Sequence, residues 1–299
     1  MATDAVLAVD LGQSGCRIKQ GDSLVVSDRG KLVGETPLKS LRSVFESLTP
    51  MRADVVTLSC TGFNGEVAEQ NSFGALCTEF FGATKVAVID DGFAGFVGAL
   101  SGRNGVVLSI GGGVVSVGGR DGKFAHRDGL GSTFGDEGGG FWLGKLAITK
   151  ALGIRQGRGD DSEMLDYFVQ ECQAFDALAV KNSAEAATLA IRTAHKVLES
   201  ADAGVSTATA IVDEGAYLLA QTVVATWYGC GGTKADSPEI VIQGGPARNA
   251  SYSTKIALEI NAKLPNAVIV QSNGDNLDGA TWIAQNMHED APPLMLWAR

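Results

Sequence analysis

Residues 105–127 read GVVLSIGGGVVSVGGRDGKFAHR, and their pattern decides the fold. An apolar run ends in three glycines, a second apolar run follows, and a polar turn leads into a third run. Short apolar runs bounded by glycine-rich turns predict three β-strands in an antiparallel meander. The same order occurs near the N-terminus, where AVLAVDLGQSG (5–15) precedes candidate strands around CRIKQ (16–20) and SLVVS (23–27). We therefore interpret the sequence as a weak internal duplication.

Strands and helices alternate between the two predicted meanders. This alternation indicates parallel strands joined by helices, in addition to the meander. After residue 141 the apolar residues recur mostly at helical spacing. No low-complexity linker separates the halves, which favours two domains packed around a cleft. The further predicted strands are 54–60, 85–91, 239–243 and 266–271, and the main predicted helices are 40–48, 64–76, 141–152, 176–201, 212–228 and 278–285.

The composition limits the class of protein. The chain has 299 residues and a formal net charge of -10, which disfavours binding to nucleic acid or to an anionic membrane. Its five cysteines are scattered without a C-x-x-C pair, so neither a disulfide framework nor a cysteine-bound metal is indicated. The N-terminus shows no signal peptide pattern, and we expect a cytoplasmic protein. The isolated histidines His126, His195 and His288 are expected to be structural.

Three glycine-rich turns each follow a predicted strand: DLGQSG (10–15), Gly111–Gly113 and Gly244–Gly245. Without a Cβ atom, backbone N–H groups can approach a phosphate oxygen closely, and several together form an anion-binding site. A hairpin turn or a helix start is the alternative for each turn taken alone. Asp10, where the first predicted strand ends, is a candidate to hold hydrated Mg²⁺, and an Asx turn is its alternative.

The stretch GSTFGDEGGGFWLG (131–144) sets two carboxylates, Asp136 and Glu137, among glycines. The glycines leave the backbone open to a small polar ligand, and the carboxylates can accept hydrogen bonds from its hydroxyl groups. Phe141 and Trp142 are expected to anchor the next helix in the core. The alternative is a tight surface loop in which Glu137 favours the helix N-terminus.

Six segments, taken in order, carry a resemblance to a known family. They are AVDLGQSG, VIDDGFAGFVGAL, LSIGGG, GLGSTFGDEGGGFWLGKLAI, VIQGGPARNAS and GATWIA. Their order resembles the BadF/BadG/BcrA/BcrD ATPase family, which includes the N-acetylglucosamine kinases, and more widely the sugar kinase, heat-shock chaperone and actin superfamily. The most specific segment is GDEGGGFWLG. The resemblance implies an α/β fold of two actin-like, ribonuclease H-like ATPase domains with duplicated mixed sheets and a ligand cleft between them.

The resemblance also implies domain boundaries and roles for individual residues. The N-terminal domain would cover 1–102, completed by a C-terminal helix at 279–299, and the C-terminal domain would cover 103–278. Asp91 matches the catalytic aspartate, although Asp90 and Asp91 are also well placed to cap the following helix. The other matching residues are Asp10, Gly12, Gln13 and Ser14 in the first phosphate loop, Gly111, Gly112 and Gly113 in the second, Gly244 and Gly245 in the adenosine-binding turn, and Asp136, Glu137 and Gly131 in the sugar site.

Two of the four segments that differ from the family pattern lie in the predicted C-terminal domain. The second loop reads GGGVV, so Val114 and Val115 stand where the kinases carry a hydroxyl side chain and, in the animal enzymes, an asparagine that touches the sugar. The segment before the signature reads GLG (129–131) in place of G-G-W-G. Both differences bear on which sugar is bound.

The implied activity is that of an ATP-dependent kinase. It would transfer a phosphoryl group from ATP, with Mg²⁺, to O6 of N-acetylglucosamine or glucosamine, with Asp91 as general base. The alternatives are a non-catalytic sugar or nucleotide sensor and an ATPase activator of a partner enzyme. Such activators hold an iron-sulfur cluster through paired cysteines, which this sequence lacks. The expected partners are a small sugar and a second copy of the chain in a homodimer, without nucleic acid or membrane.

Overall fold

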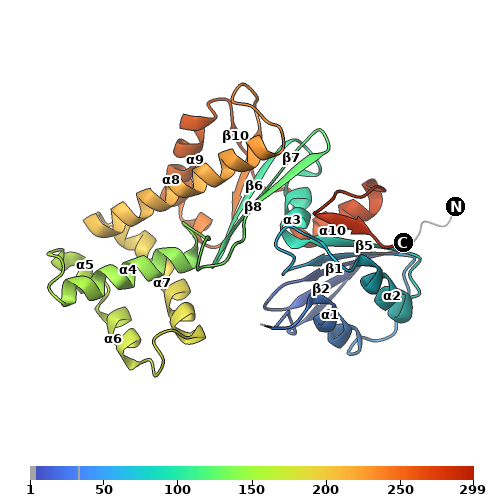
Figure 1. Cartoon of the computed structure of the whole chain (residues 1–299), viewed down its shortest axis with the longest axis horizontal. Helices are drawn as coiled ribbons and strands as arrows, with labels where there is room; N and C mark the ends of the chain where they lie inside the picture. The colour runs from blue at the N-terminus through green and yellow to red at the C-terminus, as the bar shows by residue number, and fades with distance from the viewer. Residues whose placement is uncertain (1–4, 33) are drawn as a thin grey trace.

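The computed structural model describes residues 5–32 and 34–299, and one of its two sheets has six strands. Their order is β11-β5-β4-β1-β2-β3. The strands β1, β2 and β3 form an antiparallel meander, whereas β1, β4 and β5 run parallel. This first sheet lies in the lobe at the right of Figure 1. Its strands are β1 (Val6–Leu11), β2 (Cys16–Gln20), β3 (Ser23–Ser27), β4 (Val55–Cys60), β5 (Lys85–Asp90) and β11 (Met295–Trp297).

The second sheet repeats this topology with five strands in the order β10-β9-β6-β7-β8. Its meander is β6, β7 and β8, and β9 pairs with β6 in parallel, as β4 does with β1. The common topology supports the duplication inferred from the sequence and confirms the predicted two-domain α/β fold class. The strands are β6 (Gly105–Ile110), β7 (Val114–Arg120), β8 (Lys123–Asp128), β9 (Glu239–Gln243) and β10 (Val268–Ile269).

Two helices connect the halves by crossing from one sheet to the other. Helix α3 (Asp91–Leu100) follows β5 but packs against β6 and β7, whereas α10 (Asn276–Asn286) follows β10 but packs against β1 and β4. The two helices also pack against each other, and Gly279 lies so close to the Ala94 carbonyl that a Cβ atom has no room there. Apolar side chains of both helices and both sheets form one buried cluster. The two lobes therefore share a core at their junction (Figure 1).

The remaining helices belong to one lobe or the other. Apolar residues of α1 and α2 form a core with the first sheet, and α8 packs against β6, β7 and β8 of the second. Helices α4 to α7 extend away from the second sheet at the left of Figure 1. None of the helices within residues 5–32 and 34–299 is long and apolar enough to span a bilayer. The helices are α1 (Pro37–Phe45), α2 (Gln70–Phe81), α4 (Gly140–Arg155), α5 (Ser162–Tyr167), α6 (Val169–Ala177), α7 (Ala184–Asp202), α8 (Ser206–Gly229), η1 (Pro246–Arg248) and α9 (Ala250–Lys263).

Three predictions of secondary structure are wrong in part. The helix predicted over 176–201 is interrupted, because α6 ends at Ala177 and α7 begins only at Ala184. The predicted C-terminal helix at 279–299 ends at Asn286, and the chain then forms β11 against β5. Pro292 and Pro293 lack a backbone N–H group, so a helix cannot continue through them. The helix predicted over 64–76 begins only at Gln70. The domain boundaries at 102 and 278 stay predictions.

Candidate active site

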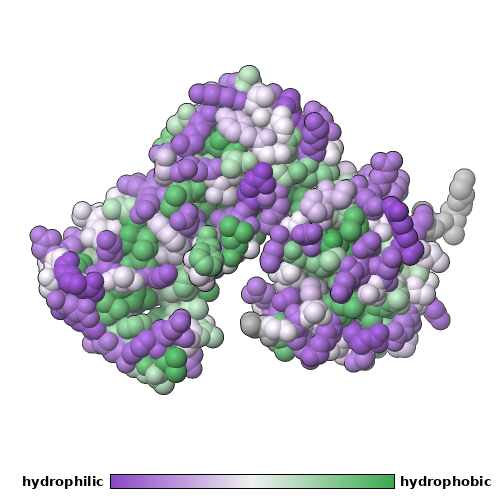
Figure 2. All heavy atoms as spheres, viewed as in Figure 1, coloured by the Kyte–Doolittle hydropathy of each residue, from purple (hydrophilic) through white to green (hydrophobic). Residues whose placement is uncertain are grey.

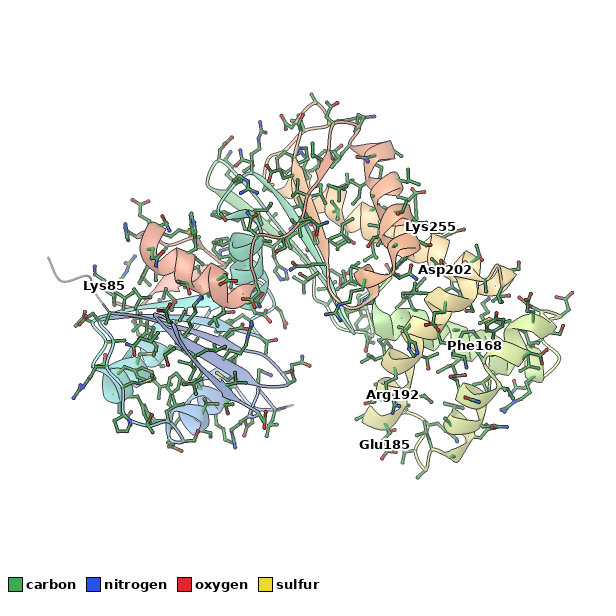
Figure 3. The ribbon with its side chains drawn as sticks, turned by 180° about the vertical axis from the view of Figure 1, so that it is seen from behind. Lys85, Phe168, Glu185, Arg192, Asp202 and Lys255 are labelled. Carbon is green, nitrogen blue, oxygen red and sulfur yellow. The ribbon has the colours of Figure 1, made fainter. Side chains whose placement is uncertain are left out.

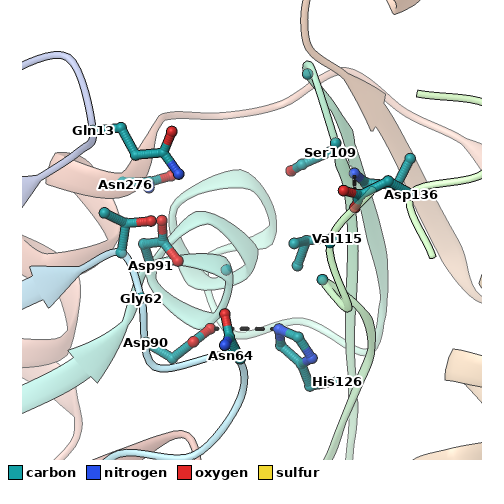
Figure 4. Close-up of a pocket in the computed structure, with 17 residues that line it drawn as sticks. Gln13, Gly62, Asn64, Asp90, Asp91, Ser109, Val115, His126, Asp136 and Asn276 are labelled. Carbon is teal, nitrogen blue, oxygen red and sulfur yellow. Dashed lines mark hydrogen bonds and ion pairs between the residues drawn. The ribbon is translucent and has the colours of Figure 1, made fainter. Parts of the chain in front are cut away.

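A polar cavity of about 490 Å³ lies between the two sheets (Figure 4). One wall comes from the carboxyl ends of β1, β4 and β5 and the first residues of α3 and α10. The other wall comes from the β6–β7 turn, from β7 and β8, and from the segment that joins β8 to α4. Ligands of α/β proteins commonly bind at the carboxyl ends of parallel strands. The lining side chains are Gln13, Thr61, Asn64, Asp90, Asp91, Ser109, Val114, Val115, His126, Asp136 and Asn276.

Asp90 and Asp91 are adjacent in the chain, but they have different environments. Asp90 is the N-cap of α3, where its Oδ1 accepts a hydrogen bond from Phe93 N at 3.2 Å. Its Oδ2 accepts from Gly65 N at 3.0 Å, so both oxygens have a backbone partner. Asp91 is the first residue of α3, and its carboxylate lies in the cavity. Asp90 therefore caps the helix, which leaves Asp91 available for chemistry.

The carboxyl group of Asp91 binds a proton unusually well. Burial and the neighbouring charge of Asp90 raise its pKa from 3.8 to about 6, against a hydrogen bond from the Thr61 side chain that lowers it. Burial disfavours the charged carboxylate because it removes hydration, and a second negative charge adds to this effect. An acid-base group with a pKa near the working pH is suited to accept a proton during a reaction. Asp91 thus has the position and the basicity expected for a general base.

Asp136 connects the signature segment to the second glycine-rich turn. Its Oδ1 accepts a hydrogen bond from Val114 N at 2.9 Å, and its own backbone N–H donates to Asp128 Oδ1 at 2.9 Å. Its Oδ2 has no hydrogen-bond partner among the residues that the structure describes, and the residue lines the cavity. Burial raises the pKa of this carboxyl group. One oxygen therefore holds the turn, and the other is free for a ligand.

The signature segment places its other predicted residues differently. Gly131 lines the cavity with a φ of 79°, and nothing lies within 4 Å of the position that a Cβ atom would take. Glu137 is exposed and does not line the cavity. Helix α4 begins at Gly140 with Gly139 as its N-cap, so Glu137 also precedes the first helical turn. The structure thus brings Gly131 and Asp136 to the site but not Glu137.

The first glycine-rich turn contributes a single side chain, Gln13, to the cavity. Gly12 N donates a hydrogen bond to Gly15 O at 2.9 Å, which closes the turn on itself. Ser14 is exposed and lines neither this cavity nor the neighbouring one. Of the four residues predicted here to bind the cofactor, Gln13 therefore lines the first cavity, and none lines the second.

Asp10 contacts two side chains of the protein, and its predicted role with hydrated Mg²⁺ stays a prediction. Its Oδ2 accepts from Arg17 Nη2 at 2.6 Å, and its Oδ1 accepts from Ser59 Oγ at 3.0 Å. Arg17 also contacts Asp275, the N-cap of α10, at 2.5 Å. The positive charge of Arg17, which contacts the Asp10 carboxylate, would repel Mg²⁺. Residues 5–32 and 34–299 contain no group of three or more acidic, histidine or cysteine side chains that could hold a metal ion, a kind of site that the prediction for Asp10 did not require.

A second cavity of about 710 Å³ adjoins the first, and Gly111 lines both. It lies between the β6–β7 turn, α7 and η1. Figure 3 labels Arg192 on α7 and Asp202 at the end of that helix. Arg192 and Arg248 line this cavity, and neither forms an ion pair with the described residues. The lining residues are Gly111, Gly112, Gly140, Ile191, Arg192, Ala194, His195, Leu198, Glu199, Gly245, Pro246, Arg248 and Asn249.

The two glycines of the predicted adenosine-binding turn, Gly244 and Gly245, have different surroundings. Gly244 has a φ of 107° and packs against the Ile110 carbonyl so closely that no Cβ atom fits. Gly245 lines the second cavity, and no atom lies within 4 Å of the position that its Cβ would take. Gly112 also lines it and packs against Ile191. The two turns thus form one wall of an elongated site that leads to Asp91.

Several lining residues were not predicted from the sequence. His126 was expected to be structural, yet its ring lines the cavity, and its Nε2 lies 3.9 Å from Asp90 Oδ1 (Figure 4). Burial lowers the pKa of this histidine, which favours the neutral ring. Asn64, Ser109 and Asn276 also belong to the cavity. Asn64 and Asn276 come from segments without a recognisable motif, whereas Ser109 lies in LSIGGG, where the glycines and not the serine were singled out.

A sequence model of the BadF/BadG/BcrA/BcrD ATPase family matches residues 2–284. The chain belongs to this family. A search of curated proteins found no match. For this ATPase family member, all five cysteines are buried and free, which does not suit a cluster shared with a second subunit. The expected homodimer and cytoplasmic location stay predictions.

Solved structures share the fold at low sequence identity. A candidate N-acetylglucosamine kinase from Chromobacterium violaceum is 19% identical with a TM-score of 0.66, over 95% of this chain and 100% of that one. A candidate N-acetylglucosamine kinase from Porphyromonas gingivalis is 14% identical with a TM-score of 0.61, over 94% and 99%. A ROK family glucokinase from Streptomyces griseus, solved with glucose and AMPPNP, is 12% identical with a TM-score of 0.55, over 94% and 99%. These similarities establish the two-domain fold.

Proposed function

We propose that this ATPase family member is an ATP-dependent sugar kinase with Asp91 as general base. The acceptor is the O6 hydroxyl of an amino sugar, N-acetylglucosamine or glucosamine. One observation carries the proposal, namely the state of Asp91. Asp90 caps α3, so the carboxyl group of Asp91 is not needed for capping, and its pKa is raised to about 6. Asp91 faces a polar cavity that adjoins a second cavity at Gly111. Two adjoining cavities, with a base in the first, suit transfer of a group between two bound molecules.

The first cavity suits the sugar, and the second suits the nucleotide. Gln13, Asn64, Asn276 and the free oxygen of Asp136 offer donors and acceptors to several hydroxyl groups. The second cavity combines bare glycine backbone with the cations Arg192 and Arg248, which suits a polyphosphate. A glucokinase of the same fold binds glucose and AMPPNP, which supports the assignment of two ligands.

In the proposed reaction, Asp91 removes the proton of the acceptor hydroxyl as its oxygen attacks the γ-phosphorus of ATP. A bond forms between the sugar oxygen and the γ-phosphorus, and the bond from that phosphorus to the β–γ bridging oxygen breaks. The products are a sugar phosphate and ADP, with the proton on Asp91. ATP would enter as its Mg²⁺ complex, with the ion on the phosphate oxygens. The chain's own work is positioning, proton transfer and exclusion of water.

A coupled assay for ADP release tests this function. Wild-type protein with ATP and Mg²⁺ is expected to release ADP with N-acetylglucosamine or glucosamine, and product analysis should locate the phosphate on O6. Calorimetry with AMPPNP measures nucleotide binding independently of turnover. Nucleotide binding without transfer to any hexose or amino sugar would favour the sensor alternative, and absence of both would contradict the proposal altogether.

A further inference from the structure

His126 is a buried polar side chain without a hydrogen-bond partner in the protein. Its side chain is 10% exposed, and its Nε2 lies 3.9 Å from Asp90 Oδ1, which is beyond hydrogen-bond distance. Neither ring nitrogen has another partner among residues 5–32 and 34–299. By contrast, His195 Nδ1 lies 2.6 Å from the Arg192 carbonyl oxygen. Because buried polar groups are normally hydrogen bonded, the ring of His126 indicates a partner that a ligand supplies.

The ring of His126 lies between two cavities. It lines the first cavity and also a third cavity of about 320 Å³, and Asn64 lines both as well. Its Nε2 faces the first cavity, where Asp90 and Gly129 are its neighbours. Its Nδ1 lies 2.9 Å from the position that a Cβ atom on Gly65 would take, and Gly65 lines the third cavity but not the first. The ring therefore separates the two cavities, with one nitrogen on each side.

The contact between His126 and Gly65 also joins the two lobes. His126 belongs to β8 of the second sheet, whereas Gly65 follows β4 of the first. A Cβ atom on Gly65 would lie 2.8 Å from His126 Cγ, so the ring packs on bare backbone and has no room to move towards it. The N–H group of Gly65 is held in turn by Asp90 Oδ2 at 3.0 Å. Both sides of the contact are thus fixed.

The His126 end of the first cavity lies away from the second cavity. The second cavity adjoins the first at Gly111, in the turn that follows β6. Figure 4 shows Ser109 and Asp136 on one side of Val115 and His126 on the other. In the proposed reaction the phosphoryl group comes from the second cavity. The part of the acceptor that is farthest from its reacting hydroxyl group therefore lies towards His126.

A large substituent on that part of the acceptor would need the space behind His126. The third cavity is lined there by the backbone of Gly65 and Gly229 and by the side chains of Phe124 and Leu294. Figure 2 shows an open notch between the lobes, which gives ligands access to the cleft. The third cavity, in contrast, becomes continuous with the first only where the imidazole ring is absent.

We propose that His126 determines which acceptors fit the first cavity. Its Nε2 forms a hydrogen bond with a hydroxyl group of the acceptor, and its ring closes the cavity behind that group. This inference rests on the proposed sugar kinase and names a specificity-determining residue of its acceptor site. A neutral imidazole can either donate a hydrogen bond to a hydroxyl group or accept one from it. Without the ring, the first and third cavities would form one space that admits a sugar enlarged at this end.

Calorimetry in the presence of AMPPNP tests this inference by binding alone. The small sugars are N-acetylglucosamine and glucosamine, and the enlarged sugars are the phenyl β-glycoside of N-acetylglucosamine and N-benzoylglucosamine. The enlarged sugars carry a phenyl group at C1 or on the nitrogen at C2, two ring positions remote from C6. The wild-type protein should bind at least one of them about tenfold or more weakly than the small sugars, because its phenyl group would overlap the ring of His126.

Two variants separate the hydrogen bond from the size of the ring. His126→Ala removes both, so the small sugars should bind about two- to tenfold more weakly. The enlarged sugar that the wild type excludes should bind to this variant at least about tenfold more tightly than to the wild type. His126→Gln retains a polar side chain and should keep most of the affinity for the small sugars.

His288→Ala is the matched control. His288 is exposed and lines none of the three cavities, so this substitution should change none of the affinities. Thermal melting confirms that each variant is folded, and the comparison of the four sugars on the wild-type protein needs no variant.

The outcomes separate the inference from the proposed function. Tighter binding of an enlarged sugar to His126→Ala supports the inference, because loss of a merely structural side chain would not raise an affinity. Equal affinities of the wild type for small and enlarged sugars would overturn the inference while the sugar kinase stands. A His126→Ala variant that binds no enlarged sugar more tightly would do the same. Binding of AMPPNP without any of the sugars would overturn the proposed function and this inference together.

Discussion

The β1–β2 turn and the β6–β7 turn occupy the same position in two sheets of one topology, yet their surroundings differ. In the first turn Asp10 is bound by Arg17 and Ser59, and the glycine N–H group of the loop is used within the loop. In the second turn Gly111 lines both cavities, and Asp136 from a distant segment is hydrogen bonded to Val114, the residue that follows the glycines. Each turn has an internal backbone hydrogen bond, from Gly12 N to Gly15 O and from Gly111 N to Gly113 O. The turns differ in that the glycines of the second line the cavities, whereas Gln13 is the one residue of the first that does.

The comparison suggests a division of work between the two sides of the cleft. The first sheet supplies the proposed base, Asp91 at the start of α3, and the Asp10–Arg17 ion pair. The second sheet supplies bare backbone, the free oxygen of Asp136 and the apolar wall at Val115. Substitutions on the first side should therefore change kcat, and those on the second side should change the KM values.

The largest effect is expected for Asp91→Asn. The amide keeps the shape of the side chain but cannot accept the proton, so kcat should fall by about 10²- to 10⁴-fold. The affinity for AMPPNP should stay nearly constant, because the second cavity does not include Asp91. Steady-state kinetics and calorimetry measure the two quantities separately.

Thermal melting provides a control for the same variant. The pKa of Asp91 is raised in the folded protein, so the unfolded chain releases this proton more readily and ionisation at neutral pH destabilises the fold. Asp91→Asn removes that cost and should raise Tm. A lower Tm together with unchanged kcat would show that Asp91 has a structural role and no catalytic one.

Asp136 tests the side of the cleft that binds the acceptor. Asp136→Ala removes a charged acceptor of about 1.5–3 kcal/mol, which corresponds to about a ten- to more than hundredfold rise in the acceptor KM. It also removes the partner of Val114 N, so Tm should fall. Asp136→Asn retains an oxygen for that N–H group and should keep Tm while still raising the acceptor KM. A fall in Tm with normal kinetics would make Asp136 a structural turn residue.

The sequence was sufficient for features that depend on local pattern. The glycine turns between apolar runs predicted both meanders, and the signature segment led to Asp136. Sequence alone left open which of Asp90 and Asp91 caps α3, because both are good caps. The structure answers this through Gly65, a residue remote in the chain whose N–H group holds Asp90.

Features that depend on long-range contacts were not predicted. The strand β11 is three residues long and exists because β5 offers an edge. The roles of His126 and Asn276 arise because β8 and α10 are brought to one cavity from opposite sheets. The ion pair between Asp10 and Arg17 depends on the pairing of β1 with β2, which sets these two residues opposite each other. Such properties arise from the assembled fold and have no signal in a short stretch.

The pH dependence of kcat/KM should reflect Asp91. The base acts when it is deprotonated, so activity should be constant above its pKa of about 6 and fall about tenfold per pH unit below it. Burial and the charge of Asp90 raise this pKa, and the charge of Asp10 raises it by a smaller amount. The hydrogen bond from the Thr61 side chain lowers it. His126→Gln should leave the acid limb in place, because the pKa of His126 is lowered and its neutral ring carries no charge to Asp91. An acid limb that shifts with His126→Gln instead would assign the titration to the histidine.

The smallest and sharpest test exchanges one hydrogen for a methyl group in each turn. In Gly113→Ala the new Cβ atom would lie 2.7 Å from both carboxylate oxygens of Asp136, so Asp136 must move and its bond to Val114 N weakens. We expect a loss of about 1–3 kcal/mol in the free energy of unfolding, with a raised acceptor KM. In Gly12→Ala the nearest atom is 3.6 Å away, an ordinary contact, so stability and acceptor KM should hardly change. Denaturant titration of both variants measures the two losses in the free energy of unfolding. Equal losses would contradict the expectation that the contact with Asp136 makes the second turn more sensitive than the first.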